Sequence, residues 1–367
     1  MKASTSQYMD LTDDQKGRAN WIFRDNKIMI ESKLNYNTTP VICTTLAKLL
    51  EAVQKELIRN CVNYDDIALT GGAASFVVCK DHSFTDLDIV IRVDNQGDWN
   101  SIANRILTAV HGTIRTLITG VEETQYILKQ FKMNDKEKWS LISLNNRASP
   151  IDLKFVYELS RDYEFSTDSF ELSLLSNRDH KLELSHQIFS NYPDVHKAIE
   201  HVQQRKCDIV QPGLVYGGGF LKYCLLKSRG YGDARTGDDL SNMIKTIVGK
   251  FFNDHFLELP PRVPNRPPQS LLYPFERYLS THFPSNDVRQ KFAFLDFAMM
   301  LISQFLSAST QRDNILARLR ALNSKIKIKA DDQDQERREQ WSSWYNPYSD
   351  HHELTHRFQS LHPASWN

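Results

Sequence analysis

The apolar and polar positions along the chain divide it into a mixed first part and a helical second part. Two segments, 44–60 and 99–117, repeat apolar residues at helical spacing. Shorter runs rich in β-branched residues predict strands at 66–69, 88–93, 139–144, 151–156 and 170–175. The turn-forming run 145–150 predicts a hairpin. Strands that alternate with helices indicate an α/β (α+β) fold with a mixed sheet.

Beyond residue 185 the pattern becomes helical. Helices are expected at 194–204, 220–228, 270–282, 287–309 and 312–324. The five prolines within 260–268 predict a loop. The polar, aperiodic end of the chain predicts a flexible tail. The resulting division is an N-terminal extension 1–36, a mixed domain 37–190, a helical domain 191–330 and a tail 331–367.

Composition narrows the function classes. The 45 basic and 45 acidic residues balance, so nucleic-acid binding would need a local basic surface. The five cysteines include no CxxC pair, which favours a reducing compartment over a disulfide framework or a structural zinc. The first sixteen residues lack the apolar core of a secretory signal. The longest apolar segment, 292–306, is shorter than the roughly 20 residues of a membrane span and is expected to be a buried helix.

Three carboxylates stand out against this background. Asp86 and Asp88 are two positions apart, so a strand would project both from one face. Asp152 lies between apolar residues at the start of another predicted strand. Three crowded carboxylates repel unless cations lie among them, and Mg²⁺ or Mn²⁺ would fit. The alternative is the ordinary polar alternation of a half-exposed strand.

A glycine pair precedes these acids. Gly71 and Gly72 follow a predicted strand and precede a short expected helix at 73–79, and thirteen residues separate the pair from Asp86. Glycine lets the backbone approach phosphate, and the amides of a helix N-terminus attract anions. The alternative for the pair is a simple tight turn. Ser75 would either bond a phosphate oxygen or serve as a helix N-terminal residue, and the sequence leaves both open.

The order of these motifs resembles the DNA polymerase β-like nucleotidyltransferase superfamily. Its pattern is a Gly-Gly or Gly-Ser pair, a short spacer, two acids separated by an apolar residue, and a later acid between apolar residues. Gly71-Gly72, Asp86-Leu87-Asp88-Ile89 and Ile151-Asp152-Leu153 match it, while Thr70 stands where a hydrophobic residue is usual. The resemblance implies a nucleotidyltransferase fold in 37–190 followed by the helical domain.

Longer stretches resemble the terminal nucleotidyltransferase five family, over roughly residues 37 to 325. They are GGAASFVVCKD, FTDLDIVIRV, KWSLISLNN, IDLKFVYEL, YEFSTDSFEL and GGGFLKYCLLKSRGY. These are animal poly(A) polymerases that work in the cytoplasm without a template. The family usually has serine at the position of Gly72 and commonly glutamate at that of Asp152.

The resemblance also implies residues for the triphosphate. Related poly(A) polymerases place a lysine on the terminal phosphates from the helix that follows Gly217 to Gly219, which is Lys222 here, and have a tyrosine nine residues later, Tyr231. Lys227 lies about 140° from Lys222 around a helix and is expected to face solvent. Tyr231 would either stack on a base or bond a phosphate, and its alternative is a packed core tyrosine. The alternative for Lys222 is an ordinary surface lysine. A basic run could follow an RNA backbone or form a solvated helix face: Arg312, Arg318, Arg320, Lys325, Lys327 and Lys329.

The implied function is template-independent addition of adenylate from ATP to RNA 3′ ends, stabilising mRNA. Asp86 and Asp88 would hold two Mg²⁺ ions, and Asp152 would bind only the one that activates the 3′ hydroxyl. The alternatives are nucleotidyl transfer to a small molecule or protein and a non-catalytic scaffold. The resemblance further implies a cytoplasmic location, with a nuclear fraction left open, and protein partners that include BCCIP and Polo-like kinase four.

Overall fold

The computed structural model describes residues 7–30, 42–94, 97–117, 128–135, 137–144, 146, 150–157, 165–177, 181–215, 218–257, 272–283 and 287–344. It divides into two compact units, residues 1–266 and 267–367. The expected boundary at 190/191 therefore falls inside the first unit. The reason is that helix α5 (Val195–Gln203) packs on the sheet through Val195, Ala198 and Val202, which belong to the same hydrophobic core.

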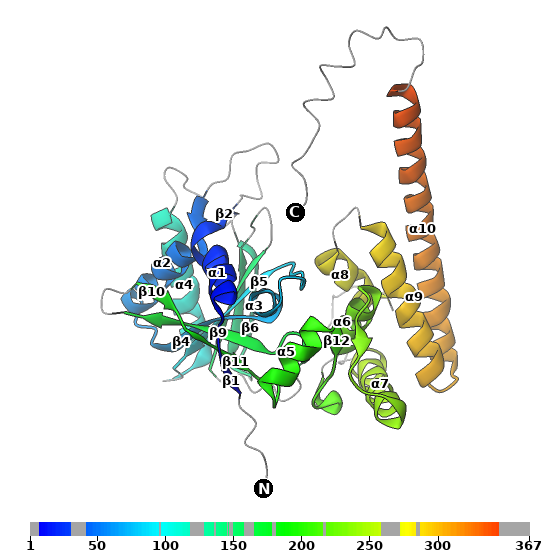
Figure 1. The fold of residues 1–367 in the computed structure, drawn as a ribbon, viewed down its shortest axis with the longest axis horizontal. Helices are drawn as coiled ribbons and strands as arrows, with labels where there is room; N and C mark the ends of the chain where they lie inside the picture. The colour runs from blue at the N-terminus through cyan, green and yellow to red at the C-terminus, as the bar shows by residue number, and fades with distance from the viewer. Residues whose placement is uncertain are drawn as a thin grey trace. The chain divides into compact units, whose positions relative to one another are not determined.

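One mixed sheet organises the first unit (Figure 1). In spatial order its strands are β1 (Tyr8–Asp10), β11 (Gln187–Ser190), β9 (Phe170–Ser176), β4 (Tyr64–Thr70), β5 (Leu87–Val93), β8 (Ile151–Val156), β7 (Trp139–Leu144) and β6 (Leu128–Asn134), and β10 (Leu182–Leu184) pairs with β9. The β5–β8 pair is parallel, and the other pairs in this sheet are antiparallel. The mixed sheet and the β7–β8 hairpin confirm the sequence predictions.

The described residues of the predicted extension, 7–30, are part of this unit, which corrects the prediction of a separate extension. Strand β1 pairs with β11, and α1 (Asp13–Asn20) begins with a capping box formed by Thr12 and Gln15. The π-helical turn η1 (Trp21–Asp25) then buries Ile22 and Phe23 in the common core. The apolar positions of this segment are spaced too irregularly to predict a helix. Burial of Ile22 and Phe23 nevertheless attaches the segment to the sheet.

Two helices cover one face of the sheet. These are α2 (Leu46–Arg59) and α4 (Trp99–Leu117), which agree closely with the predicted segments and pack on each other. In the central strand β5, Leu87, Ile89 and Ile91 are buried in the core that these helices share. Successive strand residues point to opposite faces, so Asp88 projects from the other side.

Further helices and small sheets complete the first unit. Helix α3 (Gly71–Val78) begins directly where β4 ends. Helices α6 (Gly218–Ser228) and α7 (Gly237–Phe252) pack together, and Gly230 has the left-handed backbone expected just beyond the end of α6. The remaining elements among the described residues of this unit are two small sheets and two short helical turns: β2 (Lys27–Ile30) with β3 (Ile42–Thr45), β12 (Lys206–Cys207) with β13 (Gly232–Asp233), η3 (Pro212–Leu214) and η4 (Asn253–Leu257).

The second unit contains three helices among its described residues: α8 (Tyr273–His282), α9 (Val288–Phe305) and α10 (Thr310–Trp344). Within the part of the chain that the structure describes, no helix combines the length and apolar content that a membrane crossing needs. In α9, Phe294 and Leu295 are buried while Phe292 and Met300 are exposed, so only one face is buried. The prolines of 260–268 lie outside the described residues.

Helix α10 corrects the prediction of a flexible tail from residue 331. Its backbone remains helical to Trp344. The segment beyond residue 331 is rich in Glu, Gln and Arg, which favour helix even where no apolar stripe is present. Polarity and lack of periodicity therefore predicted the wrong backbone state there. The rest of the predicted tail, 345–367, lies outside the described residues.

Candidate active site

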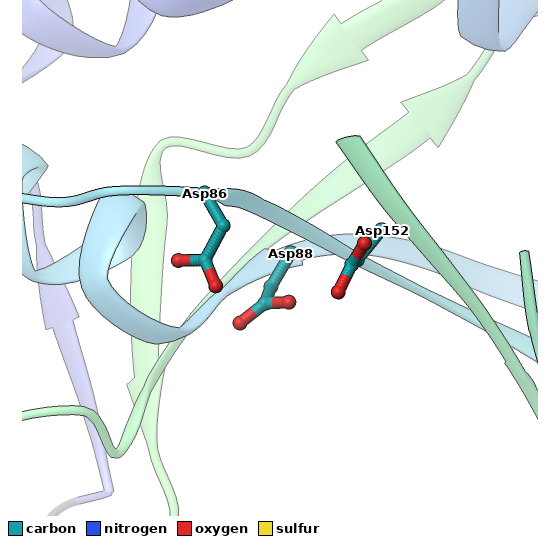
Figure 2. A group of neighbouring side chains, drawn as sticks. All are labelled: Asp86, Asp88 and Asp152. Carbon is teal, nitrogen blue, oxygen red and sulfur yellow. The ribbon is translucent and has the colours of Figure 1, made fainter. Parts of the chain in front are cut away.

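Three carboxylates converge at the start of two parallel strands. Strands β5 and β8 are in register, so Asp88 lies directly beside Asp152 on one face of the sheet. Asp86 comes two residues earlier, immediately before β5. One oxygen from each carboxylate lies within 4.8 Å of the others, and Figure 2 shows the three side chains turned to the same side. The structure thus brings together the acids that the sequence predicts to converge.

Burial and repulsion within the cluster raise the proton affinity of one of its carboxyl groups, that of Asp86. Partial burial, then the charge of Asp88, and to a smaller extent that of Asp152, raise the pKa of Asp86 to about 7. Lys154 opposes this rise: its Nζ lies 2.8 Å from Oδ1 of Asp88. Lys154 thus offsets part of the repulsion among the three acids.

The donor set fits hard divalent cations. All three candidate ligands are carboxylates, and Mg²⁺ and Mn²⁺ prefer oxygen. Asp88 and Asp152 are held in place by the pairing of β5 with β8 rather than by flexible loops. Asp86, Asp88 and Asp152 are therefore the residues that could hold such ions.

Gly71 is required by the geometry of this site. Its φ of +67° is a left-handed conformation that side chains rarely adopt, and a Cβ there would lie 2.8 Å from Oδ2 of Asp88. Beside it, a Cβ on Gly72 would lie 3.1 Å from Cβ of Phe84. The pair therefore brings the first turn of α3 against the carboxylate cluster.

The N-terminus of α3 has the character of an anion site. Thr70, which precedes it, makes no capping bond to the helix with its side chain and instead donates to the carbonyl of Asp88 at 3.4 Å. The first amides of a helix have no intrahelical acceptors. In α3 these amides lie next to the acids, as expected for phosphates bound beside metal ions.

Ser75 takes the structural role among its two alternatives. Its side chain is fully buried, and its hydroxyl lies 3.1 Å from the carbonyl of Gly71 and 2.5 Å from that of Thr167. A buried hydroxyl engaged with two backbone carbonyls is not presented to a ligand. Ser75 instead ties α3 to the loop before β9.

Lys222 reaches the same region from α6. Its Nζ forms an ion pair with Oδ2 of Asp168, which lies in the loop before β9, and the lysine side chain is about one-third exposed. Asp168 in turn lies within electrostatic reach of Asp86, whose pKa it helps to raise. Lys222 is thereby brought to the neighbourhood of the cluster.

Lys227 does not face solvent, contrary to prediction. Its side chain is only 13% exposed and its Nζ lies 2.8 Å from Oδ2 of Asp233. The angle around α6 correctly separates it from Lys222, but the segment that carries β13 covers that side of the helix. Helical geometry fixes direction, and tertiary packing decides burial.

Tyr231 is packed inside the first unit. It is 6% exposed, and its hydroxyl lies 2.8 Å from Nδ1 of His82. Burial raises the pKa of Tyr231 to about 12, so the phenol stays protonated. The guanidinium of Arg205 lies 5.2 Å from the centre of its ring. This environment favours the core role over direct stacking on a base.

Sequence reasoning missed three charged or polar neighbours of the cluster. Lys154 could have been found, because it follows Asp152 by two positions and strand alternation places both on one face. Asp168 lies two positions before the strand that begins at Phe170, and such an acid close to the start of a strand is a weak signal. His82 gives none, since a single histidine in a loop is common.

The basic run lies on α10 of the second unit. Arg318, Arg320, Lys325 and Lys327 are exposed, whereas Arg312 pairs with Asp313. The side chain of Lys329 lies outside the described residues. The exposed members form a solvated basic surface.

Comparison with known proteins shows which sequences this chain resembles. A family model described as "Nucleotidyltransferase" matches residues 11–319. The chain is 29% identical over 278 residues to terminal nucleotidyltransferase 5B of Homo sapiens, covering 70% of this chain and 63% of that protein. It is 28% identical over 296 residues to terminal nucleotidyltransferase 5C of Mus musculus, covering 74% and 71%. The alignment with 5D of Homo sapiens has 28% identity over 304 residues and covers 76% and 74%.

The chain spans about three-fifths of the length of the 5B relatives that it matches. Among solved structures, a CCA-adding enzyme in complex with CTP matches with a TM-score of 0.36 and 12% identity, over 69% of this chain and 51% of that one. The family assignment rests on the sequence match. Because the family model spans most of the 367 residues, the chain belongs to the nucleotidyltransferase family.

Proposed function

We propose that this protein transfers adenylyl groups from ATP to RNA 3′ ends without a template, using two Mg²⁺ ions. The relatives named terminal nucleotidyltransferase support nucleotidyl transfer. The resemblance to cytoplasmic poly(A) polymerases supports ATP as donor, messenger RNA as acceptor and the cytoplasm as the place of action.

One observation carries the proposal. Asp86, Asp88 and Asp152 converge within 4.8 Å beside the N-terminus of α3. A carboxylate cluster that needs cations and a helix end that attracts anions are the two halves of a site for a metal-bound triphosphate. A scaffold that had lost activity would gain nothing from keeping three mutually repelling acids together.

The residues of the chain would act by placement and charge. Two divalent ions, when bound, would supply Lewis-acid activation of the 3′ hydroxyl and charge stabilisation of the departing pyrophosphate. Asp86 and Asp88 would hold both ions, and Asp152 would hold the one nearer the attacking hydroxyl. The amides that follow Thr70 would orient the triphosphate, and Lys222 would neutralise its end. The phosphorus passes directly from donor to acceptor, so no covalent enzyme intermediate is required.

Primer extension tests the proposal. The purified protein is given a labelled RNA oligonucleotide, Mg²⁺ and each of the four nucleoside triphosphates in turn. We expect lengthening with ATP, and loss of lengthening in Asp86→Ala with an unchanged circular dichroism spectrum. Extension by that variant at the wild-type rate would refute the assignment.

A parallel assay separates the alternative acceptors. Radiolabelled ATP is offered with RNA, with protein alone and with a mixture of small hydroxyl compounds. Label on RNA supports the proposal, and label on protein or on a small molecule supports the corresponding alternative. Wild-type protein that binds ATP and Mg²⁺ but labels none of them supports the non-catalytic scaffold.

A further inference from the structure

The ammonium group of Lys222 is held by two residues of one turn. Its Nζ pairs with Oδ2 of Asp168 and lies 5.0 Å from the centre of the Phe165 ring. The amide of Asp168 donates to the carbonyl of Phe165 at 3.0 Å, so both belong to the same tight turn. We call Phe165 and Asp168 the lysine seat.

The lysine seat is fixed to the site from two sides. The Ser75 hydroxyl links the carbonyl of Thr167, within the seat's turn, to the carbonyl of Gly71. On the other side, Nε2 of His82 lies 3.7 Å from Oδ1 of Asp168, while its Nδ1 contacts Tyr231. The position of Asp168 is therefore set relative to the glycine pair that borders the carboxylate cluster.

Asp168 adds a negative charge close to the carboxylate cluster, where burial and repulsion make such a charge energetically unfavourable. It is largely buried, and its charge adds to the repulsion on Asp86. Burial alone would raise its pKa, but Lys222 and then His82 outweigh burial and lower it, so Asp168 is ionised. The negative charge of Asp168 therefore attracts Lys222 and holds it near the carboxylate cluster.

An ammonium group has three N–H donors, so Lys222 can keep its bond to Asp168 and still donate to a phosphate. We infer that Asp168 is a positioning residue: with Phe165 it holds Lys222 where the terminal phosphates of a nucleoside triphosphate bind. The inference rests on the proposed function, because that function supplies the triphosphate. It adds the group that places the lysine.

Binding measurements test the seat without requiring catalysis. Equilibrium affinities for α,β-methylene-ATP and for AMP, both with Mg²⁺, are compared in wild type, Asp168→Asn, Lys222→Met and the double variant. We expect Asp168→Asn to weaken binding of the triphosphate about tenfold and binding of AMP less than about twofold. Loss of a negative charge by itself would strengthen binding of an anion, so weaker binding reports lost positioning.

The double variant shows whether Asp168 acts through Lys222. If it does, Asp168→Asn has no further effect on triphosphate affinity once Lys222 is methionine. Losses that multiply, or equal losses for ATP analogue and AMP, overturn the inference. Should Asp168→Asn fail to fold, Asp168→Glu keeps the charge and moves it by one methylene. The triphosphate-to-AMP ratio must fall there too, and an unchanged ratio overturns the inference.

Asp233→Asn is the matched control. It breaks a second ion pair made by a lysine of α6, that of Lys227 with Asp233 of β13. We expect lower thermal stability and an unchanged triphosphate-to-AMP affinity ratio, and a ratio that falls as far as in Asp168→Asn overturns the inference.

The two proposals can fail separately. Wild type that extends RNA while Asp168→Asn keeps the ratio refutes only the seat, whereas wild type that shows the seat effect but labels no acceptor refutes only the transferase.

Discussion

Asp86 makes the stability of the metal-free protein depend on pH. Its pKa is raised from 3.8 to about 7 by burial and by Asp88. Between these values the folded state keeps a proton that the unfolded state has lost, so the contribution of Asp86 to stability falls as pH rises and levels off above about 7. Each unit of pKa corresponds to about 1.4 kcal/mol, so this contribution should fall by about 2–3 kcal/mol between pH 5 and pH 8.

Urea denaturation in the presence of EDTA measures this contribution. Unfolding free energies are compared at pH 5 and pH 8 for wild type, Asp86→Asn and Asp81→Asn. The amide that replaces the carboxyl group in Asp86→Asn cannot titrate, so the fall with pH should shrink by about 2–3 kcal/mol relative to wild type. Asp81, exposed in the same loop, is the control and should leave the fall unchanged.

Two results would refute this reasoning. One is an equal pH dependence in wild type and Asp86→Asn, which would mean that the cluster is not under electrostatic strain. The other is a wild-type stability at pH 8 that Mg²⁺ does not increase, because bound cations should offset the repulsion.

Three further changes test individual contacts. Gly71→Ala should destabilise the protein by about 1–3 kcal/mol and displace Asp88, weakening Mn²⁺ binding in a calorimetric titration. Ser75→Ala should cost about 1–3 kcal/mol in urea denaturation and leave the affinity for Mg²⁺-bound ATP analogue unchanged, since its hydroxyl holds backbone carbonyls; a fall in affinity as large as that of Lys222→Met would contradict this. Lys154→Met should lower the melting temperature in EDTA at pH 8 and enlarge the rise that Mg²⁺ produces, because the ammonium group competes with cations for Asp88; an unchanged Mg²⁺ effect would argue against that competition.

Local patterns predicted the sheet and the acids well. Buried apolar residues flank Asp88 and Asp152 along each strand. Such alternation places the acids on the opposite face from the apolar residues in any sheet, so the sequence alone predicts it. That the two strands are parallel neighbours in register is a tertiary fact. It entered the prediction only through the motif that joins them to Gly71.

What the sequence predicted wrongly, missed or left open has the opposite origin. Lys227 was placed in solvent by helical angle alone, yet Asp233 lies against it. Asp168 contacts Lys222, a residue far away in sequence, and no local pattern reports such a pairing. The burial of Ser75 likewise depends on a loop that arrives much later in the chain. Contacts between distant segments determine these roles.

The central claim is that three acids hold paired cations beneath a triphosphate. Anomalous scattering from crystals grown with Mn²⁺ and α,β-methylene-ATP tests it most directly. We predict two manganese peaks about 3.5–4 Å apart, bounded by Asp86, Asp88 and Asp152, with the triphosphate against the start of α3. Manganese absent from this cluster while the nucleotide is bound elsewhere would contradict it.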